Sequence, residues 1–131
     1  MGQEETIPSG FADEIGVEWI DFDPDNARAR IAIEPRHLQP GGMVHGGVYA
    51  SLAESICSAA TYVAVRDDDM IALGMANSTT FLRSISGGHV NAVARARHRG
   101  RTTWVWDCEL SDDEGHVCAL VRMTAAVRPR R

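Results

Sequence analysis

The chain has 131 residues, of which 44% are hydrophobic and 24% charged, and its formal net charge is −5 at pH 7. This size and composition indicate a single soluble globular domain over residues 1–131. The acidic balance argues against nucleic acid as a partner, because a general basic surface is missing. The three cysteines are an odd number in apolar surroundings, which favours reduced thiols and a cytoplasmic location over a disulfide framework.

The N-terminal part predicts a hairpin after a loosely ordered segment. Residues 1–13 are polar, and we expect little order there. Residues 14–22 and 27–35 together are rich in Ile, Val and aromatic residues, and the sequence Asp-Pro-Asp-Asn between them is a strong turn signal. A loop rich in Pro and Gly follows at residues 36–47.

Residues 48–65 predict one long helix, because they contain no helix breaker. Apolar residues lie on every side of it, which is typical of a buried helix. The stretch is about as long as a short membrane span. It also holds Glu54, four Ser and Thr residues and many alanines, so a packed helix is favoured and no membrane partner is expected.

After residues 66–69 the apolar period changes to two, which predicts strands at 71–84, 89–99, 103–110 and 117–127. We expect these strands to pair consecutively through turns at Gly87-Gly88, Arg99-Gly100 and Glu114-Gly115. The order is then ββ-α-ββββ. The predicted fold is α+β, with an antiparallel sheet of about six strands wrapped around one long central helix.

This order resembles the hotdog-fold thioesterases, and so does the motif Gln39, Gly42, His45-Gly46-Gly47, Glu54 and Ser58. The resemblance covers residues 14–127 and is to the branch whose catalytic carboxylate lies on the central helix. That branch includes one type of 4-hydroxybenzoyl-CoA thioesterase, the phenylacetate-pathway thioesterases and the 1,4-dihydroxy-2-naphthoyl-CoA thioesterases. The resemblance implies a homo-oligomer, a dimer that usually pairs into a tetramer. It also implies hydrolysis of an acyl-CoA to free acid and CoA.

Glu54 is the main catalytic candidate. Its helical neighbours at i±3 and i±4 include no cation, and an unpaired carboxylate on a buried helix costs about a few kcal/mol in desolvation. The alternative is that Glu54 emerges at an exposed edge. A carboxylate in a partly dry cleft can attack a thioester carbonyl or activate the attacking water, and the sequence leaves both mechanisms open.

Gly46 and Gly47 stand at the expected helix start, where free N–H groups and the positive end of the dipole can bind an oxyanion. A tight loop that needs glycine is the other explanation, and both can hold. Gly46 and Glu54 are eight residues apart, which is about 12 Å of helix. We therefore infer that Glu54 of one subunit meets Gly46 of another across a dimer interface.

The resemblance gives roles to three more residues. Gln39 matches the amide that bonds the thioester carbonyl or the attacking water, although alone it would be an ordinary loop residue. His45 matches a positioning residue. Ser58, one turn after Glu54, can hold the water or orient the carboxylate, or can bond its own backbone.

The run of Arg95, Arg97, Arg99 and Arg101 predicts arginines on one face of a strand. Arg99 and Arg101 are candidates for holding the phosphates of coenzyme A, and a solvated sheet edge is the alternative. The five histidines lack metal-ligand spacing, so no metal is expected. Coenzyme A belongs to the substrate, and no cofactor is implied.

The acyl group remains open. An aromatic acyl-CoA is preferred from the resemblance, and a medium- or long-chain fatty acyl-CoA is the competing substrate. A hotdog module that binds acyl-CoA without hydrolysis is a second class of function. Intact Gln39, Gly46 and Glu54 argue against that module.

Overall fold

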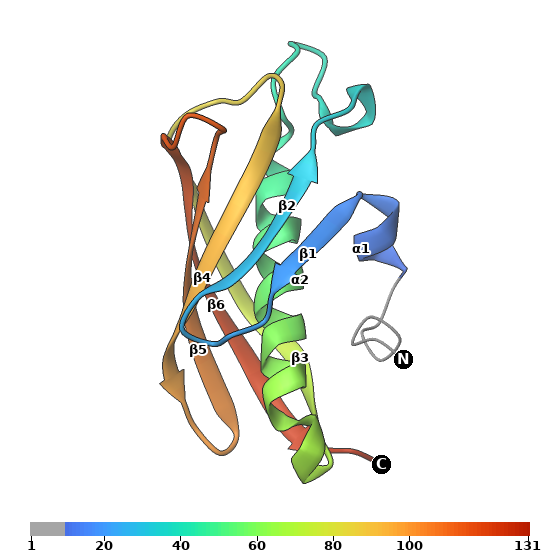
Figure 1. Cartoon of the computed structure of the whole chain (residues 1–131), viewed down its shortest axis with the longest axis vertical. Coiled ribbons are helices and arrows are strands. Elements are labelled where there is room, and N and C mark those ends of the chain that lie inside the picture. The colour runs from blue at the N-terminus through green and yellow to red at the C-terminus, as the bar shows by residue number, and fades with distance from the viewer. Residues whose placement is uncertain (1–9) are drawn as a thin grey trace.

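The computed structural model describes residues 10–131, which form one antiparallel sheet of six strands and a long helix (Figure 1). The strands run in the order β1-β2-β4-β5-β6-β3. Their bounds are β1 Val17–Asp21, β2 Ala27–Ala32, β3 Met70–Phe81, β4 His89–Arg99, β5 Thr103–Ser111 and β6 Val117–Pro129. Helix α2 spans Gly46–Val65, and the predicted order ββ-α-ββββ is confirmed.

A short helix, α1, spans Phe11–Glu14 and precedes the first strand. Residues 1–13 are expected to be loosely ordered. Of these, residues 1–9 lie outside the described residues, and residues 11–13 belong to this helix. Two 3-10 turns, Pro35–His37 and Arg66–Asp68, flank α2 in the chain.

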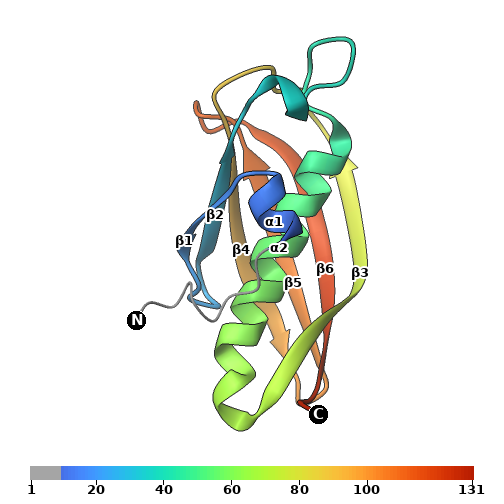
Figure 2. The same cartoon turned by 90° about the vertical axis from the view of Figure 1, so that its right-hand side faces the viewer.

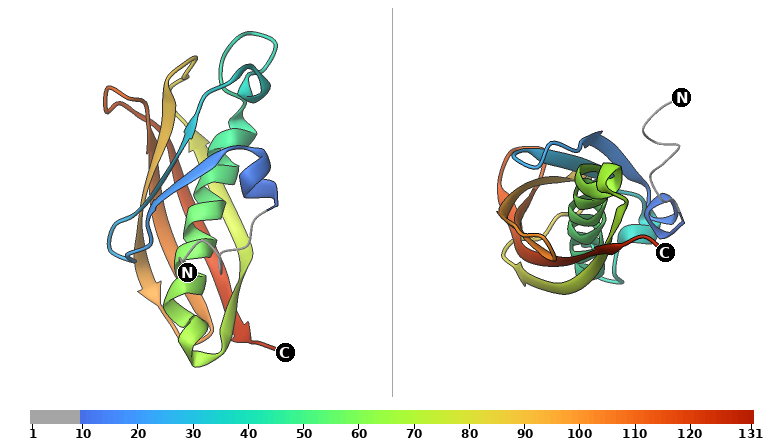
Figure 3. Two further views of the ribbon diagram at one scale, coloured as in Figure 1. Left: turned by 45° about the vertical axis from the view of Figure 1, so that its right-hand side comes forward. Right: turned by 90° about the horizontal axis from the view of Figure 1, so that it is seen from below.

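The sheet curls around α2, as the end-on view in Figure 3 shows. The alternating residues predicted to share one face of β5 are buried against the helix: Trp104, Trp106, Cys108 and Leu110. Trp106 donates a hydrogen bond from Nε1 to the Thr61 hydroxyl at 2.8 Å, and that hydroxyl donates to the Cys57 carbonyl at 2.7 Å. A buried polar pair therefore ties α2 to β5 inside the core.

The prediction that α2 is buried on every side is wrong for the single chain. Nine of its residues are buried, but one side lies in the gap between the two edge strands, β1 and β3 (Figure 2). Gly46–Asp68 is long and apolar enough to cross a membrane by length and composition, and half of an 18-residue apolar window within it is buried in this fold. In this fold the segment is the core helix of the domain.

The pairing of β3 also differs from expectation. β3 does not form a hairpin with β4 through Gly87-Gly88; it pairs with β6 over almost its whole length, from Met70↔Pro129 to Phe81↔Ala119. β4 pairs instead with β2 and β5. With β3 on the far edge, strands cover the helix from both sides, which a simple meander would not achieve.

Candidate active site

Hydrogen bonds fix the backbone at the start of α2. His45 is the N-cap residue, and its Nδ1 accepts from the Gly47 N–H at 2.9 Å. Its carbonyl oxygen accepts from the Val48 N–H at 2.9 Å. Among the described residues, the Gly46 N–H is then the donor at this helix start without an acceptor. The helix dipole makes that N–H a good partner for developing negative charge.

Gln39 lies in a tight turn just before this helix start. Its N–H donates to the Met43 carbonyl at 2.8 Å, and its carbonyl accepts from the Gly42 N–H at 2.9 Å. Gly42 has φ +91°, a conformation that favours glycine. Gln39 and Gly46 both line a pocket of about 360 Å³.

The ring of Phe81 forms another wall of this pocket. A Cβ added to Gly46 would lie 3.0 Å from two ring atoms of Phe81. Glycine at position 46 therefore lets the ring pack closely against the helix start.

Glu54 lies on the uncovered side of α2, against β3. It is exposed in the single chain, which corresponds to the exposed-edge alternative rather than to a buried carboxylate. A Cβ on Gly74 would lie 2.8 Å from Glu54 Oε2, so the missing side chain gives the carboxylate its place. The Asn77 amide donates to the Ala50 carbonyl at 3.0 Å and approaches Glu54 Oε1 at 3.5 Å. The Thr79 hydroxyl donates to Asn77 Oδ1 at 2.7 Å and holds that amide in orientation.

α2 and β3 lie side by side, so positions spaced along β3 contact different turns of the helix. Phe81 lies at Gly46 and Gly74 lies at Glu54. Gly46 and Glu54 thus lie at separate points along the contact between α2 and β3, about 12 Å apart along the helix axis.

Ser58 lines a second pocket, of about 370 Å³, that starts immediately beyond Glu54. α2 supplies Ser55, Ser58, Ala59 and Tyr62 to its wall, and the remaining lining residues are Ala12, Trp19, Ile71, Ala72 and Arg130. The wall is mostly apolar, with hydroxyl groups along one side.

The arginines of β4 do not share one face. A β-bulge between Ala96 and His98 shifts the register, so that Arg99 stands opposite Trp104 on the helix side of the sheet. There its guanidinium lies 5.9 Å from a Trp104 ring centroid and forms an ion pair with Asp25. Arg97 instead pairs with Asp107, with Nε and Oδ2 3.7 Å apart. Arg101 is exposed between β4 and β5.

Cys57 lies one turn after Glu54, and burial, reinforced by a hydrogen bond with Cys108, raises the pKa of its thiol well above the ordinary value. The thiol therefore stays protonated and is a poor nucleophile.

The turn between β5 and β6 brings together potential ligand atoms of Asp112, Glu114 and His116, within 4.8 Å of one another. The Asp112 carboxylate there accepts from the N–H groups of Glu114 and His116, at 3.0 and 2.9 Å. These bonds lower the pKa of Asp112. The hydrogen bonds of the turn thus account for the closeness of the three side chains.

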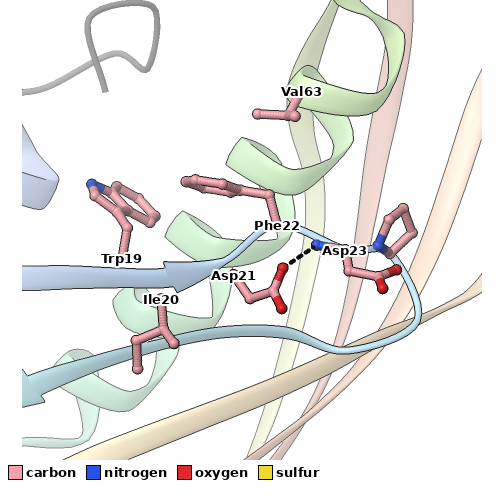
Figure 4. Close-up of a pocket in the computed structure, with 7 residues that line it drawn as sticks. Trp19, Ile20, Asp21, Phe22, Asp23 and Val63 are labelled. Atoms are coloured by element: carbon pink, nitrogen blue, oxygen red, sulfur yellow. Dashed lines mark hydrogen bonds between the residues drawn. The ribbon is translucent and has the colours of Figure 1, made fainter. Parts of the chain in front are cut away.

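Another hollow, of about 730 Å³, lies between the β1–β2 turn and the second half of α2 (Figure 4). The rings of Trp19 and Phe22 lie on its helix side, with centroids 5.7 Å apart. Asp21 and Asp23 add two carboxylates, which would repel the phosphates of coenzyme A. None of the predicted site residues lines this hollow.

The structure thus brings the predicted residues together in two groups, Gln39 with Gly46 at the start of α2, and Glu54 with Ser58 further along the helix. It adds Gly74 and Asn77, which the motif does not include. Their only sequence signal is their place in strand 71–84, whose position depends on pairing with β6.

The thioesterase superfamily model matches residues 41–119. The chain is similar to the structure of a mutant of thioesterase PA1618 from Pseudomonas aeruginosa, with a TM-score of 0.89, 36% identity, and coverage of 96% of this chain and 91% of that one. Thioesterase HI1161 from Haemophilus influenzae gives a TM-score of 0.88 at 28% identity, covering 95% of this chain and 87% of that one. The proofreading thioesterase EntH of Cronobacter turicensis is 32% identical over 89% of this chain and 85% of its own length.

A motif on the central helix, a six-stranded sheet curled around it and these matches lead to one conclusion: the chain belongs to the thioesterase superfamily, with the hotdog fold, and is a thioester hydrolase.

Proposed function

We propose that the protein hydrolyses an aromatic acyl-CoA at a site that two subunits build together.

 The single observation that carries this proposal is the position of Glu54: an exposed carboxylate where α2 lies against the edge strand β3, with a gap left for it by Gly74. The aromatic class of acyl group rests on the motif resemblance.

The chemistry assigns one task to each group. Glu54 attacks the thioester carbonyl, or removes a proton from the water that attacks it. The Gly46 N–H stabilises the oxyanion that forms on the carbonyl oxygen, an effect worth about 2.7–4 kcal/mol per donor. Collapse of that intermediate expels the thiolate of coenzyme A, which takes up a proton, and the net reaction consumes one water. These groups need no metal or redox cofactor.

The remaining predicted residues support this reaction. Gln39 shares the pocket of Gly46 and bonds the carbonyl or the water, while His45 holds the helix start through the Gly47 N–H. Ser58 is one turn beyond Glu54 and orients the water. Arg99 is already paired with Asp25, so Arg101 is the freer of the two candidates for a coenzyme A phosphate.

A second subunit is needed because Gly46 and Glu54 of one chain lie about 12 Å apart along α2. β3 has a free edge, and Leu73, Met75 and Phe81 along it are about half exposed, at 52%, 55% and 56%. If two copies of β3 pair antiparallel about their middles, the Phe81 end of one strand approaches the Met70 end of the other. That pairing brings Gly46 of one subunit toward Glu54 of its partner. We propose the homodimer on this basis, with a dimer of dimers as the larger assembly and the cytoplasm as the location.

The test is release of free thiol from a panel of aryl-CoA and fatty acyl-CoA thioesters. We expect Glu54→Gln to lower kcat/KM by about 10²–10⁴. Glu114→Gln, in the exposed β5–β6 turn, is the matched control and should keep full activity. Binding of acyl-CoA without hydrolysis by the wild type would instead support the non-catalytic module, and faster turnover of fatty acyl-CoA would overturn the aromatic assignment.

A further inference from the structure

The pocket beyond Glu54 is formed by the same two elements, α2 and β3, that meet at Glu54. On α2, Ser58 follows Glu54 by one turn and Tyr62 follows by two. On β3, Ala72 lines the pocket two residues before Gly74, which contacts the Glu54 carboxylate. An acyl group whose carbonyl lies at Glu54 can therefore extend directly into this pocket.

The size and walls of the pocket suit a large flat acyl group. Its volume is about 370 Å³, whereas an apolar cavity of about 150 Å³ already binds benzene. Trp19 contributes an aromatic wall from β1, and Ile71, Ala59 and Ala72 contribute aliphatic ones. The space therefore exceeds what a single unsubstituted ring would fill.

The end of the pocket farthest from Glu54 is polar and rich in hydrogen-bond donors. Arg130 donates from Nη2 to the Tyr62 hydroxyl oxygen at 3.1 Å, and its guanidinium lies 5.8 Å from the Tyr62 ring centroid. Asp69 forms an ion pair with Arg130, with Nε and Oδ1 3.3 Å apart. Because the Tyr62 oxygen accepts from Arg130, its own O–H hydrogen is left to donate to another acceptor.

We infer that this pocket receives the acyl group, and that Tyr62 and Arg130 select acyl groups with a hydrogen-bond acceptor, such as a ring hydroxyl, at the end far from the thioester. The inference rests on the proposed role of Glu54. Asp69 balances the charge of Arg130, so a neutral hydroxyl suits this end better than a second carboxylate. A site built to bond a hydroxyl discriminates against the analogue that lacks it, because its donors are then left without a partner.

The experiment compares kcat/KM for 6-hydroxy-2-naphthoyl-CoA and 2-naphthoyl-CoA, two substrates that differ by the distal hydroxyl alone. We expect the wild type to favour the hydroxylated substrate by about tenfold. Tyr62→Phe and Arg130→Met should each bring this ratio close to one. Arg122→Met removes a guanidinium that pairs with Asp107 on the outer face of the sheet, and it should keep the wild-type ratio.

The outcomes separate the inference from the proposed function. If no thioester of the wider aryl- and fatty acyl-CoA panel is hydrolysed either, the proposed function itself fails; if others are hydrolysed but neither naphthoyl-CoA is, the inference alone fails. Hydrolysis of both at equal kcat/KM, or a ratio that survives in both variants, overturns the inference alone. A rise in KM for both substrates and weaker inhibition by free coenzyme A in Arg130→Met would show that the guanidinium binds the coenzyme instead, which also overturns it.

Discussion

Glu54 owes its position to a residue that has no side chain. Gly74 leaves the space that the carboxylate occupies, and Asn77 and Thr79 form the hydrogen-bonded pair beside it. At the residue scale the site is therefore shaped as much by β3 as by the motif on α2.

We expect Gly74→Ala to lower activity with little effect on folding. The new Cβ would lie 2.8 Å from Glu54 Oε2 and 3.1 Å from Met123 Cε, and the carboxylate is the end of a flexible side chain that can move away. Displacing a catalytic group by about 1 Å costs roughly ten- to a hundredfold in rate. Thiol-release kinetics and thermal unfolding measure the two effects. Gly87→Ala, where an added Cβ meets nothing within 4 Å, is the control, and equal activity of both variants would contradict the role of Gly74.

At the element scale, α2 and β5 are joined by the hydrogen bond from Trp106 to Thr61. Thr61→Val keeps the shape but leaves the buried Trp106 N–H without an acceptor. We expect a loss of about 1–3 kcal/mol in the free energy of unfolding, measured by urea denaturation. In a Trp106→Phe background the same change should cost less, because no N–H is then left unpaired. An equal cost in both backgrounds would show that this hydrogen bond is not the cause.

The motif residues could be predicted because they lie within one loop and one helix, where local spacing determines their neighbours. Gly74 and Asn77 could not, because the partner of β3 is the distant β6 and no local turn signal reports it. The prediction that the arginines of β4 share one face was wrong for a related reason. One extra residue in the bulge of β4 transfers Arg99 to the other face, and the apolar alternation does not reveal that bulge.

At the scale of the whole molecule, the free edge of β3 is the surface on which the proposed dimer depends. We expect Leu73→Glu to produce monomers and to abolish activity, because a charge on an exposed edge strand opposes strand pairing. Light scattering and thiol release test both effects on the same sample. Leu120→Glu, at a comparably exposed leucine of β6 (44%, against 52% for Leu73), should keep the dimer and the activity. An active Leu73→Glu monomer would contradict a site shared between subunits.

Mixing inactive subunits tests the shared site directly. Glu54→Gln and Gly46→Ala homodimers should each have little activity. The first lacks the carboxylate at both sites, and in the second the added Cβ, 3.0 Å from two ring atoms of Phe81, disturbs the backbone that carries the oxyanion donor. After exchange of subunits at equal amounts, half of the dimers are mixed, and each has one intact site, so about a quarter of the wild-type activity should return. Mixtures that stay inactive despite exchange would place both groups in one chain.

The late pairing of β3 has a consequence for how the protein is made. On a ribosome, residues 70–81 emerge well before residues 117–129, which are their partner in the sheet. During that interval an apolar strand and one side of the central helix are uncovered, a state that invites wrong association between nascent chains. The closing of β6 against β3 is thus the event that ends this exposure, and the yield of folded protein in cells should depend on how quickly translation reaches the last strand.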